Sequence, residues 1–454
     1  MSFDLICVGG GIAGSSLARA MAAAGAKVLV LERERKFRDR VRGEQLQPWG
    51  VAEAKRLGLY ELILKAGGVE ALWWSTHRVG ERSRQRRALS ASGPHRLPGV
   101  NVQHPVLQEA VLGAAEAAGA TVLRGAMVTG MTQGARASVS YRLGGVEQRR
   151  TGRLVVAADG RASRARVWAG GRVSLGASRL RLGGVLLTGL VVEPSVVNVH
   201  YDFAGGLMVM VAEVGGGRQR VYLGFHAGRR IGAAPGRGSL VRGSLVRGSL
   251  GRGSPAHGPP APGEPMGPAR ARRAAERLSL EAFTRLAQTA GATDYGLESA
   301  TPAGPLAVFD GRESWVDTAA GDGLVLIGDA AAVSDPNFGC GLALTLRDVR
   351  VLVDELLVAE DPRAGARAYA ASQRDYAAAL RRLVDWLTTV YREPGEAADR
   401  LRDRLLPLLE REPWRIPDLV AAGPDAASDR QARALLLAED IHGPDWHGLG
   451  PWRP

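Results

Sequence analysis

Residues 3–32 read FDLICVGGGIAGSSLARAMAAAGAKVLVLE and set the organisation of the chain. The apolar runs 3–8 and 27–31 are typical of buried strands, and the alanine-rich segment 15–24 is typical of a helix. Between the first strand and the helix, Gly9, Gly11 and Gly14 stand at the spacing G-x-G-x-x-G. In a strand–turn–helix unit this spacing permits a tight turn, a close approach of backbone to a pyrophosphate, and close packing of helix on strand.

Glu32 completes this pattern. It follows Gly14 by 18 residues and ends the second apolar run, where a carboxylate can accept hydrogen bonds from a ribose hydroxyl. Because strand, helix, strand and acid occur in this order, we interpret the segment as a dinucleotide-binding unit rather than as a glycine-rich turn alone.

The size and cysteine content of the chain argue against a disulfide-stapled protein and against a metal site made of cysteines. With 454 residues it can form two domains or one large composite. Its two cysteines, Cys7 and Cys340, are too few for a disulfide framework and too far apart for a metal site. The first strand begins at residue 3 and no run of about 18 apolar residues occurs. We therefore expect a cytoplasmic protein with no bound metal, no signal peptide and no stable membrane insertion.

The formal charge of +13 is concentrated in one segment. Residues 229–273 hold nine arginines and one acid, a net +8 that leaves +5 for the rest of the chain. Within this segment, residues 232–269 repeat Arg-Gly-Ser-Leu-Val and then become rich in Pro and Gly, a composition that predicts a disordered insertion. Binding of RNA or an anionic surface is the alternative. No aromatic residue is interleaved for bases to stack on, so we expect no nucleic-acid partner.

Two further strand ends carry an acid and glycines. The apolar run 154–158 leads into Asp159-Gly160, within a D-G-x-x-S-x-x-R pattern over 159–166 that could also be a plain turn with Ser163 as a helix cap. A second run, 323–327, ends in Gly328-Asp329 and is followed by P-x-x-G-x-G over 336–341. Ligands of open α/β sheets gather at such strand ends, and amides at a helix N-terminus can hold an anion or an electron-rich ring edge.

Other segments complete the expected architecture. Residues 51–66 have a helical pattern, 138–142 and 147–150 form hairpin strands, and a long helix after residue 341 has one apolar face, formed by Leu342, Leu346, Val349, Val353, Leu356 and Leu357. Residues 182–225 contain repeated strands separated by Gly-rich turns, which predicts an antiparallel sheet over a substrate pocket. His200, Tyr201 and His226 on this sheet are candidate substrate contacts, although a lone histidine on a strand is more often structural.

Together the three motifs resemble those of the p-hydroxybenzoate hydroxylase-like, single-component FAD-dependent monooxygenases, from about residue 3 to about residue 360. The resemblance implies an α/β fold in which a Rossmann-like FAD-binding domain is interleaved with an antiparallel-sheet substrate domain and followed by a helical C-terminus. The expected FAD-binding segments are 1–75, 105–180 and 323–360. The expected substrate-domain segments are 76–104, 181–231 and 270–322, and the insertion 232–269 and the helical region 361–454 complete the chain.

The resemblance also implies which residues hold the cofactor. The first motif would bind the ADP half of FAD, Asp159 the pyrophosphate and pyridine nucleotide, and Asp329 the ribityl chain. Pro336 and Asn337 would lie at the flavin edge, and no protein residue is certain to be catalytic. The full set of implied FAD contacts is Gly9, Gly11, Ile12, Ala13, Gly14, Glu32, Arg33, Arg42, Gln108, Asp159, Gly160, Gly328, Asp329, Pro336, Gly339, Cys340 and Gly341.

The implied reaction is a monooxygenation. NADPH or NADH, bound only transiently, would reduce the resident FAD. Oxygen would add at flavin C4a, and the resulting C4a-hydroperoxyflavin would hydroxylate or epoxidise an electron-rich small molecule. The apolar sheet 182–225 suggests an aromatic or polyketide-like substrate from secondary metabolism, and we expect a monomer or a homodimer.

Three alternatives compete with this interpretation. A halogenase of the same superfamily is disfavoured because W-x-W-x-I-P is missing and no lysine follows Lys65. A prenyl-reductase-like FAD-dependent reductase stays open, as does a non-enzymatic, arginine-rich surface or nucleic-acid binder. The sequence also departs from many relatives at Ala332, where they have histidine, and at Cys340, which often is a small or amide residue; neither change should prevent FAD binding.

Overall fold

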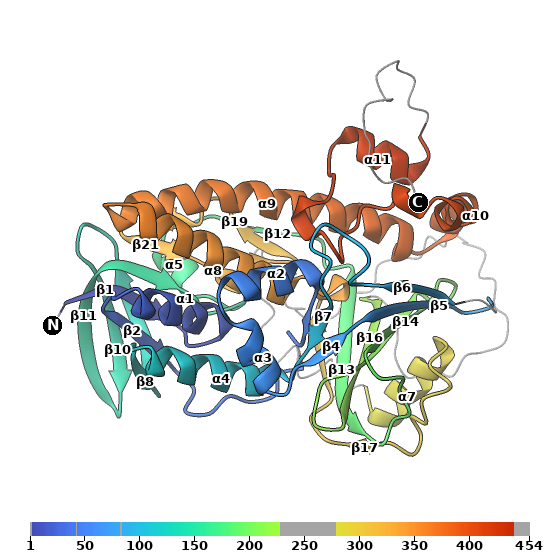
Figure 1. The fold of residues 1–454 in the computed structure, drawn as a ribbon, viewed down its shortest axis with the longest axis horizontal. Coiled ribbons are helices and arrows are strands. Elements are labelled where there is room, and N and C mark those ends of the chain that lie inside the picture. The colour runs from blue at the N-terminus through green and yellow to red at the C-terminus, as the bar shows by residue number, and fades with distance from the viewer. Residues whose placement is uncertain (1, 42, 82–83, 228–277, 440–454) are drawn as a thin grey trace, which may run out of the picture.

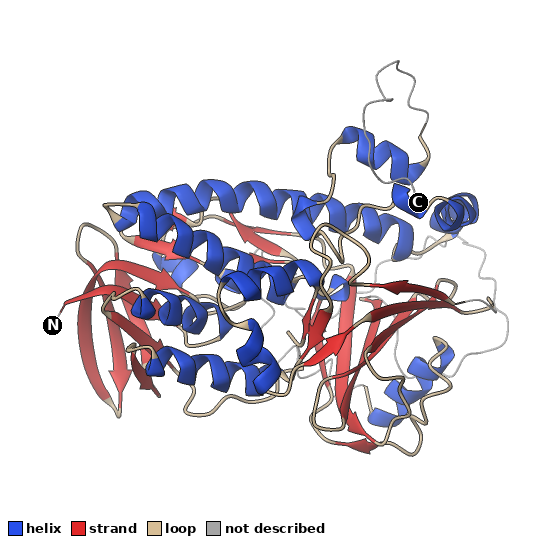
Figure 2. Cartoon of the chain, in the orientation of Figure 1, coloured by secondary structure: helices blue, strands red, loops and turns tan. Residues whose placement is uncertain are grey.

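The structure is a computed structural model that describes residues 2–41, 43–81, 84–227 and 278–439. A parallel sheet with its helices forms one end of the molecule, and an antiparallel sheet forms the other (Figure 1). Long helices lie along the parallel sheet and reach toward the antiparallel one (Figure 2). The predicted fold class is confirmed. The insertion expected at 232–269 and the candidate Arg42 lie outside the described residues.

The first sheet is built around β1 (Ser2–Val8), whose apolar residues are buried. β11 (Val146–Ala157) and β2 (Val28–Glu32) flank it in parallel, and β21 (Leu324–Leu326) and β8 (Thr121–Arg124) extend the sheet on either side. β9 (Met127–Thr132) and β10 (Ala137–Leu143) add an antiparallel extension to β11, and β20 (Ala320–Gly321) pairs with β21. Because β1, β11 and β21 are parallel neighbours, their carboxyl ends meet at one edge.

Two predicted boundaries are wrong in detail. The strands expected at 147–150 and 154–158 are one strand, β11, because Thr151 and Gly152 pair with both β1 and β10 and leave no break. The single helix expected at 51–66 is two helices, α2 (Pro48–Arg56) and α3 (Tyr60–Lys65). Gly58 separates them with a positive φ of 63°, a conformation that cannot continue a helix.

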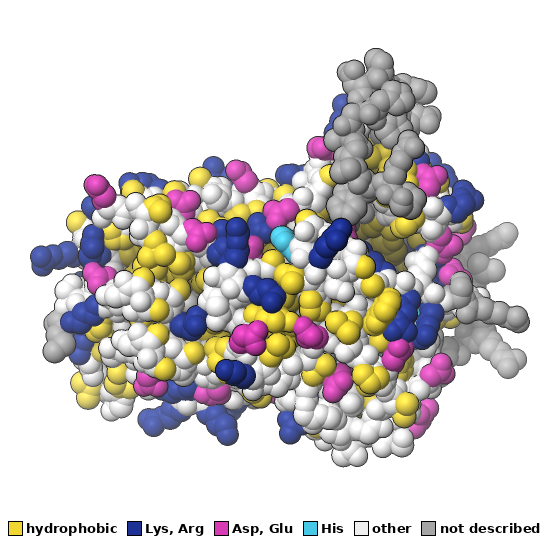
Figure 3. Space-filling model, viewed as in Figure 1, with side chains coloured by type: hydrophobic (Ala, Val, Ile, Leu, Met, Phe, Trp, Pro, Cys, Tyr) yellow, Lys and Arg dark blue, Asp and Glu magenta, His cyan; other side chains and the backbone are white. Residues whose placement is uncertain are grey.

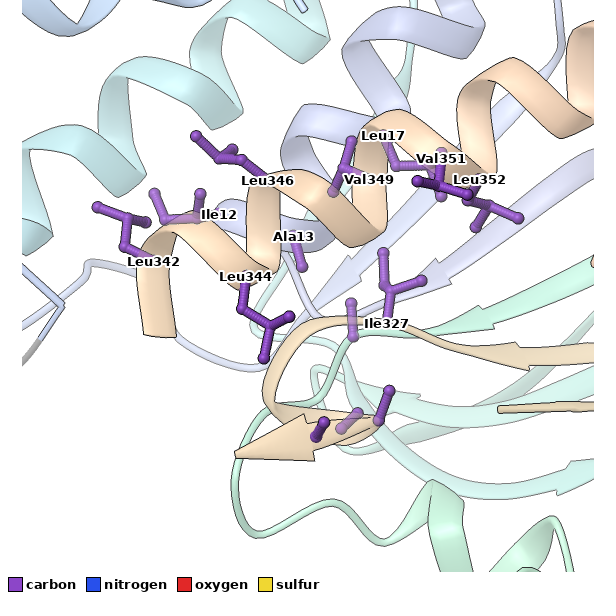
Figure 4. Packing of buried hydrophobic residues seen from close by; sticks show 14 of the residues in the cluster. Ile12, Ala13, Leu17, Ile327, Leu342, Leu344, Leu346, Val349, Val351 and Leu352 are labelled. Carbon is purple, nitrogen blue, oxygen red and sulfur yellow. The ribbon is translucent and has the colours of Figure 1, made fainter. Parts of the chain in front are cut away.

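Long helices cover the first sheet and pack on one another. α1 (Ile12–Ala23) contacts α4 (His104–Ala117) and α8 (Gly341–Val358), and α8 packs in turn against α2 and α9 (Pro362–Tyr391). Leu342, Leu346 and Val349 lie beside Ile12, Ala13 and Leu17 of α1, with Ile327 below them (Figure 4). α8 is buried on more than the one predicted face, since Leu344 and Leu352 are also buried. Leu357, predicted on the buried face, is 56% exposed.

The second sheet is antiparallel along most of its width. Its central strands are β13 (Leu180–Thr188), β16 (Arg218–His226), β15 (Leu207–Glu213) and β14 (Val196–Asp202). β5 (Trp73–Arg78) pairs in parallel with β14 and antiparallel with β6 (Gln85–Ala88), while β17 (Thr301–Pro302) and β18 (Ala307–Asp310) pair with β13. Helix α7 (Leu280–Thr289) covers one face around Phe283 and Ala287. The opposite face is directed toward the parallel sheet.

Short elements connect these two parts. β3 (Gln45–Leu46), β7 (Gly99–Asn101) and β4 (Val69–Ala71) form one small sheet, and β12 (Val173–Leu175), β19 (Ser314–Val316) and β22 (Ala332–Val333) form another. The remaining elements are α5 (Ala165–Trp168), α10 (Glu396–Arg411), α11 (Arg430–Leu437) and the 3₁₀ turns η1 (Gly328–Ala330), η2 (Pro336–Phe338), η3 (Pro413–Arg415) and η4 (Gly423–Asp425).

Among the described helices, none is both long and apolar enough to cross a membrane. Lysine and arginine side chains are dispersed over the face shown in Figure 3, with acidic side chains among them. On that face the structure offers no continuous basic surface of the kind that nucleic-acid binding requires.

His200 belongs to the face of β14 that packs toward α7. Its Nε2 lies 2.8 Å from the Tyr295 hydroxyl, and its ring stacks on His77 with centroids 4.3 Å apart. Burial, reinforced by the neighbouring His77, lowers the pKa of His200 to about 4, while Asp294 acts weakly in the opposite direction. His200 is therefore neutral in the folded protein at pH values where it would be protonated in the unfolded chain.

We predict that the folded protein loses stability as the pH falls from about 6.5 toward 4. The unfolded state binds the His200 proton near its ordinary pKa of about 6.5, so protons favour unfolding across this window. Between pH 6.5 and pH 5 the expected loss from this group is about 1.6 kcal/mol. Urea unfolding of the wild type and of His200→Asn at several pH values measures it. An equally steep decline in the variant would show that other groups cause the effect.

Candidate cofactor and substrate site

A cavity of about 2200 Å³ lies between the two sheets. Its wall includes the turn after β1, the ends of β2 and β11, the loop 329–341, the inner face of the antiparallel sheet and part of the segment 409–427. Single-ligand pockets usually measure about 300–1,000 Å³. The cavity therefore has room for a large cofactor and a second ligand together.

The glycine motif forms one end of this cavity. A Cβ on Gly14 would collide with the carbonyl oxygen of Gly9, and a Cβ on Gly9, whose φ is +103°, would collide with the carbonyl of Ala158. At Gly11, by contrast, a Cβ would meet only Gln108 Nε2, at 3.6 Å. Gly9 and Gly14 thus serve the packing of α1, whereas Gly11 leaves open space at the N-terminus of α1, where free amides favour an anion.

The acid at the end of β2 is fixed in place beside this turn. Glu32 is 6% exposed, and its two carboxylate oxygens accept hydrogen bonds from the backbone N–H groups of Gly10 and Glu34, both at 2.7 Å. Each oxygen keeps further acceptor capacity, and Glu32 lines the cavity together with Arg33 and Gln108. This arrangement is suited to binding ribose hydroxyl groups near a pyrophosphate.

The second motif serves two purposes. Oδ2 of Asp159 accepts hydrogen bonds from the backbone N–H groups of Arg164 (2.8 Å) and Ala165 (3.2 Å) and so caps α5. Ser163 Oγ adds a bond from the N–H of Arg166 at 3.3 Å. Oδ1 of Asp159 is buried beside the cavity with no partner among the described residues. The turn is thus a helix cap that leaves one carboxylate oxygen for a ligand.

Arg166, the last residue of the second motif, connects it to the third. Its Nε donates to the carbonyl of Ala330 at 2.6 Å, and its Nη2 donates to the carbonyl of Asp329. Burial lowers the pKa of Arg166, while Asp329 and Asp159 oppose that shift. The backbone N–H of Gly328 donates to Asp348 Oδ2 at 2.7 Å. These bonds fix the turn that presents Asp329 to the cavity.

The third motif continues as a rigid loop into α8. Oδ1 of Asp335 accepts from the backbone N–H (2.9 Å) and from Nδ2 (2.7 Å) of Asn337, and Gln47 Nε2 donates to the carbonyl of Phe338 at 2.7 Å. Gly339 follows with a φ of +67°, and α8 begins at Gly341, so its free amides lie at the cavity wall. The Asn337 side chain is directed at Asp335 and at Gly224 of β16.

The predicted site residues divide into those that line the cavity and those that do not. The lining set is Gly9, Gly11, Ile12, Ala13, Glu32, Arg33, Gln108, Asp159, Gly160, Tyr201, Asp329, Pro336, Asn337, Gly339 and Gly341. Gly14, Gly328 and Cys340 support this wall from behind, with Gly328 packed on Ala13 and Cys340 buried against Gln47 and Phe338.

The three candidates on the antiparallel sheet behave differently from one another. Tyr201 faces the cavity and lies 5.6 Å, between ring centroids, from Tyr391. His200, its neighbour in the strand, points to the opposite face, because successive side chains of a strand alternate. His226 lies at the end of β16 beside Gly206. Neither histidine is part of the cavity wall, so the structure gives no support to their role in substrate contact.

Several cavity residues were not predicted from the sequence. The inner face of the antiparallel sheet contributes Leu182, Met208, Met210 and Phe309, and the C-terminal segment contributes Leu409, Trp414, Ile416, Leu419 and Val420. Ion pairs hold this segment against β5 and β6, from Arg87 to Asp418 at 3.0 Å and from Arg78 to Glu410. The strands expected at 182–225 predicted an apolar sheet without showing which residues face inward, and nothing in the sequence indicated the C-terminal wall.

A buried ion pair joins the antiparallel sheet to the loop after β2. Arg220 is 1% exposed and donates to both carboxylate oxygens of Glu44, at 2.6 and 2.7 Å, and to Asp39 at 2.8 Å. The Tyr222 hydroxyl donates to Glu44 at 2.9 Å. Burial raises the pKa of Glu44, and the bonds from Arg220 oppose this shift. Glu44 and Tyr222 both line the cavity. The Arg220–Glu44 ion pair therefore fixes part of the cavity wall.

Comparison with known proteins agrees with this geometry. Residues 2–235, more than half of the chain, match the family model described as FAD binding domain. The chain belongs to this family. The resemblance stated from the three motifs is confirmed, and the acceptor atoms, open glycine and helix N-termini described above fit FAD.

The individual relatives are more distant. A squalene epoxidase of Schizosaccharomyces pombe is 37% identical over 76 residues, which span 17% of this chain and 16% of that protein. The p-nitrophenol 4-monooxygenase of Pseudomonas putida superposes with a TM-score of 0.66 at 17% identity, covering 96% of this chain and 97% of that one. A flavin-dependent brominase superposes with a TM-score of 0.63 at 16% identity, covering 96% and 97%. At these identities the structural matches show the shared fold.

Gly11 and Gly14 form a matched pair for testing this FAD-binding site. In Gly11→Ala the new methyl group occupies open space where the pyrophosphate would approach, so we expect FAD affinity to fall at least tenfold while the apoprotein stays folded. In Gly14→Ala the methyl group meets the Gly9 carbonyl, so the apoprotein itself should be destabilised. FAD titration by fluorescence and thermal unfolding of both apoproteins separate the effects. Unchanged FAD affinity in Gly11→Ala would contradict this placement of the pyrophosphate.

Proposed function

We propose that this chain is an FAD-dependent monooxygenase. It uses NADPH or NADH and O₂ to hydroxylate or epoxidise an electron-rich, mostly apolar small molecule. The observation that carries the proposal is one continuous cavity that combines the three FAD motifs with an apolar wall from the antiparallel sheet and the C-terminal segment. A resident cofactor and a substrate would thus meet inside the same cavity.

The described residues suggest how FAD would be placed. The amides at the start of α1 would bind the pyrophosphate and Glu32 the adenosine ribose. Asp329 would accept from the ribityl hydroxyls, and the loop 336–341 with the N-terminus of α8 would line the isoalloxazine ring. When bound, FAD supplies the hydride acceptance and oxygen activation that protein side chains lack.

The apolar wall supports a mostly apolar substrate. Met208, Met210 and Phe309 on one side and Ile416 and Val420 on the other enclose the space beyond the flavin loop. Excluding water from such a site protects reactive intermediates from decay and strengthens the electrostatic contacts within the site. Tyr201 and Tyr222 supply hydroxyl groups in this wall and could orient an aromatic or polyketide-like ligand.

The principal alternative is an FAD-dependent reductase of the same superfamily. The shared fold does not decide between the two activities, since the structural relatives include a p-nitrophenol 4-monooxygenase and a protein described as a flavoprotein/dehydrogenase. The locally similar sequences are named squalene epoxidases and squalene monooxygenases, which favours oxygenation. A reductase would convert its substrate without oxygen, whereas the proposed enzyme would not.

The proposal is tested by product analysis. Purified protein should carry FAD and oxidise NAD(P)H faster when a true substrate is added. With ¹⁸O₂ and a panel of phenols, polycyclic aromatics and polyenes, the product should gain one labelled oxygen atom. Anaerobic conversion, or a protein that cannot be loaded with FAD, would overturn the proposal.

Removing the Asp329 carboxylate should weaken FAD binding. In Asp329→Ala the bonds from Arg166 to the main-chain carbonyls of residues 329 and 330 can persist, so the turn should keep its shape. The loss is then that of a charged hydrogen-bond acceptor, for which about 1.5–3 kcal/mol is typical, or about ten- to a hundredfold in the FAD dissociation constant. The measurement is FAD retention after gel filtration, with Asp317→Asn as an exposed control. Wild-type retention in Asp329→Ala would exclude Asp329 from the FAD site.

A further inference from the structure

A pair of unpartnered polar groups lies in the cavity wall next to the loop 335–341. β19 and β22 are antiparallel, with Ser314 opposite Val333 and Trp315 opposite Ala332, so the next opposed residues are Glu313 and Ser334. Both line the cavity. Glu313 Oε1 and Ser334 Oγ are buried, and neither has a hydrogen-bond partner among the described residues.

Such atoms require an explanation. Leaving a buried polar group unpaired costs about 1–3 kcal/mol, and nearly all buried polar groups in folded proteins have partners. Two of them occur here side by side, facing a cavity and directly before Asp335 and Pro336. The position favours a ligand, or water held with it, as the missing partner.

The surroundings of Glu313 favour its protonated form. Burial raises the pKa of Glu313 to about 7, and the nearby Asp335 carboxylate adds to this shift. Asp385 of α9 acts in the same direction, whereas Arg381 of α9 and the backbone N–H of Asp335 oppose it. Asp335 is itself buried, which raises its own pKa, while Asn337, Arg392 and Arg161 favour its charged form. A carboxyl group in this setting can both give and take a proton near neutral pH.

We propose that Glu313 is the proton donor of the oxygenation reaction and that Ser334 is a second hydrogen-bonding group for the bound ligands. This inference rests on the proposed monooxygenase function. The overall reaction, substrate + O₂ + NAD(P)H + H⁺ → oxygenated substrate + NAD(P)⁺ + H₂O, consumes one proton per turnover. The O–O bond breaks, one oxygen atom bonds to the substrate, and the other leaves as water. Glu313 gives its proton to the departing oxygen, and solvent returns a proton to the carboxylate.

The experiment compares Glu313→Gln with Asp317→Asn as a matched carboxyl-to-amide control. Asp317 follows β19, is exposed, and lies outside the cavity wall. In the wild type, turnover with saturating substrate should decline as the pH rises through about 7, because the donor is lost. Glu313→Gln should lower turnover about a hundredfold at pH 7, within the range for general acid catalysis, and should abolish this pH dependence. Asp317→Asn should retain both the rate and the profile.

A second readout does not depend on turnover. Because the pKa of Glu313 is higher in the folded than in the unfolded protein, ionising it destabilises the fold as the pH rises from about 4.5 through 7. The melting temperature of apo Glu313→Gln should therefore improve relative to that of the apo wild type between pH 5 and pH 8. Asp317→Asn should show no such change. Parallel melting curves for Glu313→Gln and wild type across this range would overturn the proposal.

If Glu313→Gln fails to bind FAD, the variants Glu313→Asp and Ser334→Ala still test the proposal. Glu313→Asp retains an acid and should restore the decline in turnover with pH, at a lower rate. Ser334→Ala should lower turnover severalfold with the FAD dissociation constant unchanged. Wild-type enzyme without NAD(P)H- and O₂-dependent product would refute the proposed function itself. Active wild type with an unchanged pH profile in Glu313→Gln would refute only the role of Glu313.

Discussion

The contact between the turn after β1 and the end of β11 is the constraint on which the site depends. Main-chain atoms of Gly9 and Gly14 approach each other and Ala158 so closely that no side chain fits between them. This contact places the N-terminus of α1 beside Asp159, although the two are separated by about 150 residues. Arg166 then extends the same arrangement to β21, since it bonds to the main chain of Asp329 and Ala330. The three motifs act together because backbone packing and one buried guanidinium hold them together.

The antiparallel sheet is attached to this assembly by a different kind of interaction. Arg220, Glu44 and Asp39 form a nearly fully buried charged cluster between β16 and the loop after β2. A buried ion pair often adds little net stability, but losing one partner leaves an uncompensated charge and is strongly destabilising. Such a pair tolerates few alternative geometries. Its effect here is to hold the antiparallel sheet at one distance from the three motifs and so to define the cavity.

Much of this arrangement could be predicted from the sequence because the decisive signals are local. An acid or a glycine at the end of an apolar run marks a strand end, which made Glu32, Asp159 and Asp329 candidates. The resemblance of the three motifs to an FAD-dependent family then implied their roles. The role of Arg166 was not found, although it is part of a quoted motif. Its partners lie more than 160 residues away, and no spacing rule connects them. Glu313 was missed for the same reason, since only the pairing of β19 with β22 brings it beside Ser334.

His200 shows a further limit of sequence reasoning. Because side chains alternate along a strand, His200 and Tyr201 face opposite sides. Alternation alone does not show which of the two sides faces a cavity. Both faces of β14 are buried, with Val197 and Val199 on one and Asn198, His200 and Asp202 on the other. The residue types therefore did not show which face lines a cavity. Helix α7, through Phe283, covers the side of the sheet that His200 faces, so His200 points away from the cavity. The same ambiguity affected α8, where Leu344 and Leu352 are buried because helices pack on more than one of its sides.

The location of the C-terminal wall has a consequence for how substrate choice is encoded. The match to the FAD-binding family ends at residue 235, whereas Trp414, Ile416 and Val420 belong to a segment some 180 residues later. The cofactor motifs are thus held by main-chain packing, in which few substitutions are possible. The C-terminal segment is held to β5 and β6 by ion pairs with partly exposed partners, which contribute little to stability. Side chains in this part of the wall can therefore change without disturbing the three motifs. Under the proposed function, the choice of substrate would then vary separately from the chemistry.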